Sequence, residues 1–393
     1  MRVARGTVRA VNALAARWAG VGDGGTVFSA AGVWPLLALL ADGAGGAARA
    51  ELADAVRLPA GQAAAAAREL LGGLAEMRGV DSALGLWTKR TLELREAWAA
   101  GLPAEAHGVL TGDVGVDQAT LDAWAAKRTG GLIERMPVAL TDATELVLAS
   151  ALSLRTEWLR PFEETPMESP YWSDRVPLGL TRTSVLLDRV GVADTPHGHV
   201  TRLKVLSKSA IDVHLLLGEE GMTSGQVLGA GVEILDSRHP VVPGDRLPYG
   251  DPGPGLRVAK RRCMTPEPPT LDVTTVAYDM SARHELLRLH RLFGLTTARD
   301  ATRGHFPGIS PFPLAIGSAE QSVTARFSAR GFHAAAVTAF DAVATGVPDL
   351  RYLTTVVTAR FDRPFAFLAL HRHTRLVLAA GWVTEPESYP EED

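Results

Sequence analysis

The segment that decides the fold runs from Gly331 to Thr345 and reads GFHAAAVTAFDAVAT. In a strand, successive side chains point to opposite faces. One face would then carry only residues that cannot ionise, namely Phe332, Ala334, Ala336, Thr338, Phe340, Ala342 and Ala344. Both ionisable residues, His333 and Asp341, would lie on the other face. This division is typical of a strand with one buried face and one wetter face.

The same segment also fits two other structures. Its alanines favour a helix, because Ala is the best helix former. Beyond Thr345 the chain continues as GVPDL, and Gly and Pro at such positions favour turns, so the segment also suits an exposed loop. The residues alone leave strand, helix and loop open.

The composition of the whole chain excludes several classes of protein. Its 393 residues are 46% hydrophobic and 21% charged, which is typical of a globular protein with a large core. The net charge of -4 gives no electrostatic argument for nucleic acid or an anionic membrane as a partner. No run of about 20 apolar residues predicts a membrane span. The single cysteine, Cys263, excludes an internal disulfide framework.

The N-terminal residues bear on location. From Met1 to Arg9 they are basic, and charges interrupt any apolar stretch that would serve as a secretion signal. We therefore expect a cytoplasmic location by default. Arg is more frequent than Lys, and Ala and Gly are abundant, which indicates a GC-rich bacterial genome.

Hydrophobic patterning predicts a mixture of helices and largely antiparallel strands. We expect helices over residues 9–19, 33–42, 49–56, 94–101, 121–129 and 281–293, and a loop followed by a helix over 219–228. We expect strands over residues 27–29, 82–88, 145–154, 200–206, 211–217, 322–327, 356–361, 365–370 and 375–383. The stretch 236–269 is rich in Pro and Gly and is expected to be a long connection with short strands. This mixture predicts an α+β fold.

Short motifs follow one another in order over most of the chain. They are Phe28-Ser29 with Leu36–Leu40, Gly43-Ala44 and Arg49–Leu52; Trp124, Thr129, Gly131 and Ile133; Leu146–Leu152 with Trp158 and Pro161-Phe162; Phe306–Ser310; Gly331 with Ala334–Ala336; and Asp362–Phe365 with Gly381. As a set, they resemble the serpin family of serine protease inhibitors, in a divergent member of bacterial type.

The resemblance implies a fold with a movable part. The chain would be a single domain over residues 1–393, of α+β class, with three β-sheets and about eight or nine helices. Residues 329–353 would form the hinge and an exposed reactive-centre loop. The hinge itself would consist of Gly331, Phe332, His333, Ala334, Ala335 and Ala336.

The resemblance also implies a function. A target serine protease, or a cysteine protease, cleaves the loop, which then inserts into the largest sheet while the protease is still acylated. The inhibitor needs no cofactor and supplies no catalytic residue, because its metastable fold is protected kinetically and releases stored free energy. We expect a monomer without a nucleic-acid or membrane partner. The resemblance also allows an extracellular location.

The position of the cleaved bond follows from the resemblance as well. It places the bond at Thr345–Gly346, about 46 Å of extended strand beyond Gly331 at ~3.3 Å per residue. The small residue Thr345 would suit an elastase-like or subtilisin-like protease. The loop is longer than is usual in the family, so a bond at Arg351–Tyr352, which would suit a trypsin-like enzyme, stays open as an alternative.

Two departures from the family bear on function. Phe332 replaces a small residue on the face that would be buried, so we expect insertion to require room for its ring, and overpacking costs about 1–3 kcal/mol. Gly32, Ser150 and Gln321 stand where the family has a polar gate that controls sheet opening, and we group Trp158 with them. We expect Gln321 and Ser150 to share a hydrogen bond. These departures keep a second function open, that of a non-inhibitory serpin-fold protein that acts as a binding or scaffold module.

Other candidate sites are weaker. His197 with His199, and His371 with His373, are His-x-His pairs that would each face one way on a strand, as a metal site requires. Neither pair has a cysteine nearby and both lie in turn-like contexts, so we expect no metal site. The basic run 260–262 is expected to be a solvated edge, and Cys263 a buried, inert thiol. The absence of a Gly-x-Ser-x-Gly elbow and of a P-loop argues against an enzyme.

Overall fold

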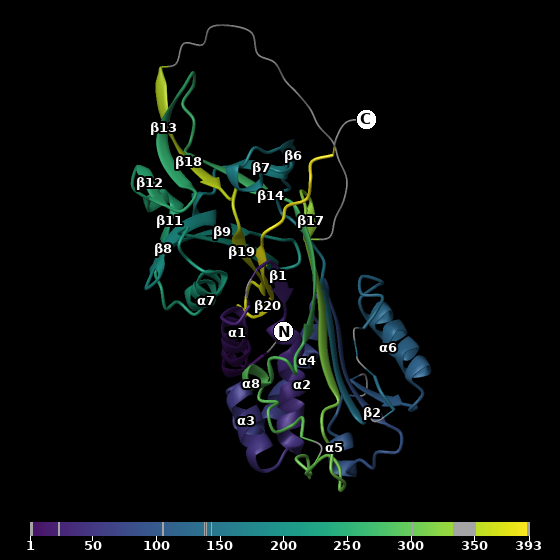
Figure 1. The fold of residues 1–393 in the computed structure, drawn as a ribbon. Helices are drawn as coiled ribbons and strands as arrows, with labels where there is room; N and C mark the ends of the chain where they lie inside the picture. The colour runs from purple at the N-terminus through teal and green to yellow at the C-terminus, as the bar shows by residue number, and fades with distance from the viewer. Residues whose placement is uncertain are drawn as a thin grey trace.

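The computed structural model describes residues 3–22, 24–103, 106–136, 138, 140–142, 144–300, 302–332 and 351–390. Among these residues it has eight α-helices, arranged around three β-sheets (Figure 1). The helices are α1 (Arg5–Ala19), α2 (Ala30–Gly43), α3 (Gly46–Val56), α4 (Ala60–Ala75), α5 (Glu96–Ala99), α6 (Val114–Arg128), α7 (Ser224–Leu235) and α8 (His290–Phe293). Short 3-10 turns occur at η1 (Pro170–Trp172), η2 (Leu187–Arg189) and η3 (Gly244–Arg246). The expected α+β class is confirmed.

The first two sheets are joined through their C-terminal strands. In order, the first sheet consists of β1 (Thr26–Phe28), β20 (Val377–Val383), β19 (Phe365–His371), β10 (Ile211–Gly218), β9 (Gly198–Val205), β8 (Val190–Thr195) and β11 (Val241–Pro243). The second consists of β12 (Gly250–Gly253), β13 (Leu256–Cys263), β18 (Tyr352–Arg360), β14 (Thr270–Val276), β7 (Leu178–Ser184) and β6 (Glu163–Pro166). Strand β18 of the second sheet leads directly into β19 of the first.

The third sheet contains the longest strands. In order, it consists of β3 (His107–Leu110), β2 (Val80–Lys89), β4 (Leu146–Leu154), β16 (Ser318–Phe327), β17 (Gly331–Phe332) and β5 (Thr156–Glu157), with β15 (Tyr278–Glu285) paired to β16. Figure 1 shows α6 on one side of these strands and the N-terminal helices on the other.

Burial of β4 on both faces explains its apolar sequence. All of its residues are buried. Leu148 and Leu152 pack in the main core, whereas Val147 and Ala149 point the other way and pack in a second cluster that includes Leu121 of α6. Two covered faces require a continuous apolar run rather than an alternating one, which is the pattern that predicted this strand.

Local capping fixes where several helices begin. Ser29 precedes α2, and its side chain accepts a hydrogen bond from the backbone of Gly32. Asp113 caps α6 in the same way, through Val116. Thr223 is the N-cap residue of α7 and forms a capping box with Gln226. These caps satisfy backbone N–H groups that the first turn of a helix leaves without partners.

The structure corrects several expected elements. Residues 281–293 do not form one helix, because Ser281–Glu285 belong to β15, which pairs with β16 along its whole length and alternates between exposed and half-buried residues after the buried Tyr278. The expected helix over 94–101 shrinks to the short α5. Within 236–269, the strand β13 pairs fully with β18 and is no mere connection. The helix α4, rich in alanine, was not predicted.

One hydrophobic cluster runs from Val8 to Val383 and includes residues of all three sheets. In the part of the chain that the structure describes, no helix has the length and apolar character that a membrane span requires.

Candidate functional site

The segment that we expect to form the hinge, called the hinge below, begins inside the third sheet, at β17. Phe332 is opposite Thr156 of β5 on one side and opposite Phe327 of β16 on the other. Gly331 leaves no space for a side chain, because a Cβ there would lie 2.1 Å from the carbonyl oxygen of Thr156. The first two hinge residues therefore already lie between the two strands that flank them.

The side chain of Phe332 lies in an aromatic cluster and is 1% exposed. Its ring centroid is 6.3 Å from that of Phe367, which in turn stacks on Tyr278 at 5.3 Å. Tyr278 also stacks on Phe327, again at 5.3 Å. We expected insertion to require new room for the Phe332 ring. The structure corrects this point, since the aromatic cluster already encloses the ring.

Trp158 fixes the turn that leads into the hinge. Its indole Nε1 donates to the carbonyl oxygen of Ser328 at 2.9 Å, and its backbone N–H donates to Arg330 at 2.9 Å. Its ring lies 4.9 Å from that of Phe327. The hydroxyl of Ser328 donates to the carbonyl oxygen of Gly331 at 2.8 Å. Trp158 thus orients the hinge.

Below the hinge, β4 and β16 pair directly as parallel strands. We call this pairing of residues 147–152 with 318–323 the seam. Ser150 and Gln321 are opposite each other in it. Any strand that entered between β4 and β16 would have to separate this pair.

The gate residues meet in the middle of the seam. Gln321 is fully buried, and its Nε2 donates to the carbonyl oxygen of Ser29 at 2.8 Å and to the hydroxyl of Ser150 at 3.4 Å. The backbone N–H of Ser29 donates back to Oε1 of Gln321 at 2.9 Å. The expected hydrogen bond between Gln321 and Ser150 is present. A Cβ at Gly32 would lie 2.7 Å from the Ser150 hydroxyl, so Gly32 belongs to this cluster too.

Trp158, which we grouped with these residues, lies elsewhere. It contacts Phe327, at the far end of β16 from Gln321. Residues that are separated by several positions along a strand cannot share a cluster, because each residue adds ~3.3 Å. We therefore use the name gate for Ser29, Gly32, Ser150 and Gln321 only.

Two residues near the gate were missed by the sequence analysis. Ser29 was recognised only as part of a motif, yet its hydroxyl also donates to the carbonyl oxygen of Leu378 at 2.6 Å. His284 is opposite Gln321 on β15, and its Nε2 contacts the carbonyl oxygen of Val27 at 2.8 Å. Burial lowers the pKa of His284. A Ser at a helix N-cap was the available signal for Ser29, whereas a wrongly predicted helix hid His284.

An acidic pair lies one residue from the gate. Glu320 is opposite Glu285 of β15. Burial, and then the negative charge of Glu285, raise the pKa of Glu320 to about 8. The carboxyl of Glu320, a residue of the seam, therefore holds its proton at neutral pH.

The remaining loop residues lie outside the described residues. This applies to His333, Ala334, Ala335 and Ala336 of the hinge and to the proposed bond Thr345–Gly346. Of the alternative bond, Tyr352 is the first residue of β18 and is opposite Cys263, with 45% of its surface exposed.

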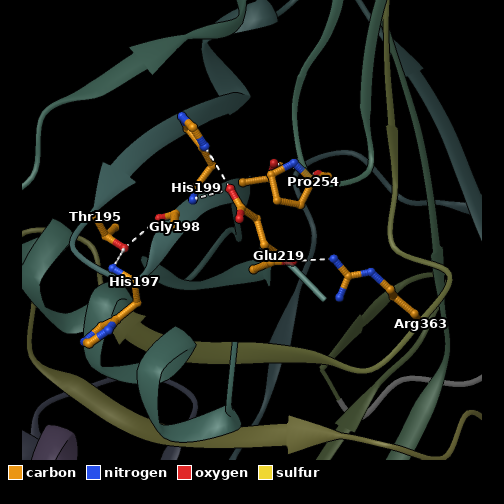
Figure 2. A network of polar contacts seen from close by, with 9 residues as sticks. Thr195, His197, Gly198, His199, Glu219, Pro254 and Arg363 are labelled. Atoms are coloured by element: carbon orange, nitrogen blue, oxygen red, sulfur yellow. Dashed lines mark hydrogen bonds and ion pairs between the residues drawn. The ribbon is translucent and has the colours of Figure 1, made fainter. Parts of the chain in front are cut away.

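The histidine pairs do not converge. His199 contacts Glu219, with 2.9 Å between Nδ1 and Oε1, whereas His197 contacts Gln226 at 3.3 Å. Figure 2 shows the two imidazole rings directed away from each other. His371 contacts Thr374 at 2.9 Å, and no group of three His, Cys, Asp or Glu residues that could hold a metal occurs among the described residues. The expected absence of a metal site stays a prediction.

The basic run and the cysteine lie on β13. Residues 260–262 are opposite Leu353, Thr354 and Thr355 on β18, and all three are exposed. Cys263 is buried and free. Both findings agree with the expected solvated edge and buried thiol.

Comparison with known proteins adds an independent line of evidence. The family model of the serpins, serine protease inhibitors, matches residues 5–177. No curated protein matches the chain by sequence.

Solved structures resemble the whole chain. A serpin from the trematode Schistosoma haematobium is 14% identical with a TM-score of 0.68, covering 98% of this chain and 100% of that one. Thyroxine-binding globulin in complex with thyroxine is 16% identical with a TM-score of 0.72, covering 97% and 99%. Tengpin, a thermophilic serpin in its native state, is 14% identical with a TM-score of 0.73, covering 96% and 93%.

At these identities the solved structures establish the fold alone, over nearly the whole chain. The motifs, the three sheets and both comparisons agree: residues 5–177 match the serpin family model, and serpins are structural neighbours over nearly the full chain.

Proposed function

We propose that the protein is a suicide-substrate inhibitor of a serine-type endopeptidase. The protease cleaves the chain within residues 329–353, and the cleaved segment then inserts between β4 and β16. The chain contributes no catalytic residue, because the protease supplies its own nucleophile. The observation that carries the proposal is β17, where the first hinge residues already pair with both flanking strands.

The register of β17 supports continuation into the seam. Thr156 and Phe327 are both opposite Phe332, and they are separated in number by the same amount as Ser150 and Gln321 in the closed seam. An inserted strand can therefore run antiparallel to both neighbours without a bulge. Six residues further along each strand, this register would place Thr338 between Ser150 and Gln321.

The side-chain pattern of the loop also suits insertion. In that register, even-numbered loop residues would face the main core beside Leu152 and Val323, which belong to it. These residues carry no ionisable group, so their burial has no charge penalty. The odd-numbered His333 and Asp341 would lie on the opposite face.

For the cleaved bond, we propose Thr345–Gly346. Cleavage there leaves a segment long enough to cross the gate and fill the seam. The alternative at Arg351–Tyr352 would lie at the first residue of β18, where the chain is already held in a ladder with β13. A protease needs an accessible, extended substrate segment, which favours the earlier bond.

Incubation with proteases tests the proposal. The purified protein is mixed separately with subtilisin, elastase and trypsin, and the products are separated on denaturing gels and weighed by mass spectrometry. The proposal predicts a detergent-stable complex of summed mass and a released peptide that begins at Gly346. Cleavage by all three enzymes without any complex would contradict inhibition.

A second function, that of a non-inhibitory binding or scaffold protein, has one observation in its favour. Gln321 makes hydrogen bonds to both Ser29 and Ser150, and these hold the seam closed. Thyroxine-binding globulin, which shares the fold, is described with thyroxine bound. Cleavage without complex formation, and without a rise in the melting temperature of the cleaved protein, would favour this function.

A further inference from the structure

A concave pocket lies on the first sheet, far in sequence from the hinge and the gate. Its volume is about 650 Å³, which lies within the range of small-molecule sites. We call it the basic pocket, and the argument rests on six of its lining residues, Arg202, Lys204, Leu206, His214, Leu370 and Arg375.

The end of α7 creates the pocket. Along most of its length α7 covers one face of the first sheet, where Gly231 packs so closely that a Cβ would lie 2.2 Å from Leu216 and 3.0 Å from Leu368. The helix ends at Leu235. Beyond that point charged residues of the same face of the sheet line the pocket.

Strand geometry brings the cations together. Arg202 and Lys204 are two residues apart on β9 and so point to the same face. His214 of β10 is directly opposite Lys204. Arg375, from the turn between β19 and β20, reaches the end of α7, where it donates to the carbonyl oxygen of Leu235 at 2.7 Å.

Asp212 lines the pocket and is buried, but its carboxylate is already paired with Arg372. Asp212 is 1% exposed, and both of its oxygens accept hydrogen bonds at 2.7 Å from Arg372. It also accepts one from the backbone of Ser207 at 3.0 Å. Asp212 and Arg372 therefore form a closed ion pair, and the charge of Asp212 contributes little to the environment of Lys204.

The acidic residues at the rim do little for the central cations. Oδ2 of Asp188 is 2.6 Å from Arg189 and 4.0 Å from Lys204, so Arg189 holds it more closely. Glu233 pairs with His239 at 2.9 Å and with Arg238 at 3.4 Å.

Two buried nitrogen atoms have no partner. Within the described ranges, Nε of Arg202 and Nδ1 of His214 are buried without a hydrogen-bond partner. The His214 side chain is 7% exposed. Buried polar atoms normally have partners, and leaving one unpaired is destabilising. Two such atoms in one basic pocket leave room for an acceptor from outside the chain.

The cations also repel one another. Burial, and then the positive charge of Arg375, lower the pKa of Arg202. Burial, followed by the charges of Arg202 and Lys204, lowers the pKa of His214 well below its ordinary value. A bound anion would relieve this repulsion.

We propose that the basic pocket binds a small organic phosphate, with the phosphate group between Arg202, Lys204 and Arg375 and the organic part against Leu206 and Leu370. A dianion matches several converging cations better than a single carboxylate does, and guanidinium groups bind phosphate through paired hydrogen bonds. The apolar wall gives the organic part its contact. The site goes beyond protease inhibition and does not depend on it.

Phenyl phosphate is the probe that tests this site. Inorganic phosphate and phenol are titrated separately, because each represents one part of the probe. Calorimetric titration of the full chain at low salt is expected to show saturable binding of one phenyl phosphate, weaker binding of inorganic phosphate and none of phenol. Arg202→Gln and Lys204→Gln are each expected to weaken binding by about tenfold, the effect of one lost charge-assisted hydrogen bond.

Arg238→Gln is the matched control, because it removes one nearby positive charge from an exposed side chain that does not line the pocket. Its affinity for phenyl phosphate is expected to stay within about twofold of the wild type, since exposed charges contribute little. An equal loss in Arg238→Gln would overturn the site in favour of a general charge effect. No binding of phenyl phosphate to the wild type would overturn it outright.

Nuclear magnetic resonance keeps the test independent of variant stability. In the unmodified protein, phenyl phosphate is expected to shift the ring signals of His214 and to leave those of His290 on α8 unchanged, since His290 does not line the pocket. Binding without a shift at His214 would place the ligand elsewhere and overturn the proposal.

Discussion

The two ends of the seam hold β4 and β16 in different ways. At the hinge end, β17 already separates their continuations, and an aromatic cluster around Phe332 stabilises the open arrangement. At the gate, β4 and β16 touch, and the hydrogen bonds of Gln321 keep them together. Under the proposed mechanism, apolar packing at β17 would begin the insertion, and the polar contacts of the gate would oppose it.

This difference indicates which contacts would oppose the proposed insertion. Phe332 is buried before cleavage, so its burial contributes little further free energy when the rest of the loop enters. The gate must break instead, and its buried polar groups must find new partners in the incoming strand. Thr338 would reach the gate in the continued register and could supply them.

The largest effect is expected from breaking the hinge end with Phe332→Arg. An unpaired cation among aromatic rings has a high desolvation penalty, so β17 should leave the sheet. We expect the yield of protease complex to collapse and cleavage to proceed as in a simple substrate. The measurement is the fraction of protease that becomes detergent-stable complex on a gel.

Phe332→Leu is the control for that variant, because it keeps an apolar side chain and should retain most of the complex. Undiminished trapping by Phe332→Arg would show that insertion does not begin at β17.

A smaller effect is expected from opening the gate with Gln321→Ala. The variant leaves the buried backbone N–H of Ser29 without its acceptor, which costs about 1–3 kcal/mol. We expect a lower melting temperature of the intact protein and faster insertion of the cleaved loop. Gln62→Ala, on the exposed surface of α4, should change the stability by less than about 0.5 kcal/mol. Equal melting temperatures for both variants would remove the gate from this account.

Gly32→Ala tests the gate from the side of α2, where Gly32 lies beside Ser150 and Gln321. The added Cβ would lie 2.7 Å from the Ser150 hydroxyl and 3.1 Å from Nε2 of Gln321, so these groups must move. We expect a loss of about 1 kcal/mol, toward the lower end of overpacking costs, in chemical denaturation.

Gly6→Ala in α1 is the matched control, since nothing lies within 4 Å of a Cβ there. This variant should be stabilised by up to about 1 kcal/mol through helix propensity. A similar gain for Gly32→Ala would show that the gate tolerates a side chain.

A pH-dependent effect is expected from Glu320→Gln. The pKa of Glu320 is raised from 4.5 to about 8, by burial and then by Glu285. Between these values the unfolded chain binds fewer protons than the folded one, so stability falls as pH rises through this window. Glutamine cannot ionise, so the variant should gain melting temperature over the wild type as pH rises from 5 to 8, by roughly 2–4 °C for each kcal/mol recovered. A constant difference over that range would contradict a raised pKa.

Much of the fold could be predicted from the sequence in those segments whose residue pattern has a single structural explanation. The apolar run of β4 indicated burial on both faces, and the ordered motifs indicated the family. Periodicity misled where two patterns overlapped, as in 281–293, because alternation along β15 passes directly into the short helix α8.

The candidate site was predicted less completely. Gly32, Ser150 and Gln321 do meet, but Trp158 lies at the other end of β16, because a motif gives no distance along a strand. The role of Ser29 depends on a contact with Gln321, nearly three hundred residues later in the chain, and no local pattern encodes it.

Thermal unfolding of the intact and the loop-cleaved protein, side by side, tests the central claim most directly. Insertion adds a full strand between β4 and β16 and satisfies the separated backbone groups of both, so the cleaved protein should melt well above the intact one. Equal melting temperatures after complete cleavage within 333–350 would mean that the seam stays closed, and would contradict the account.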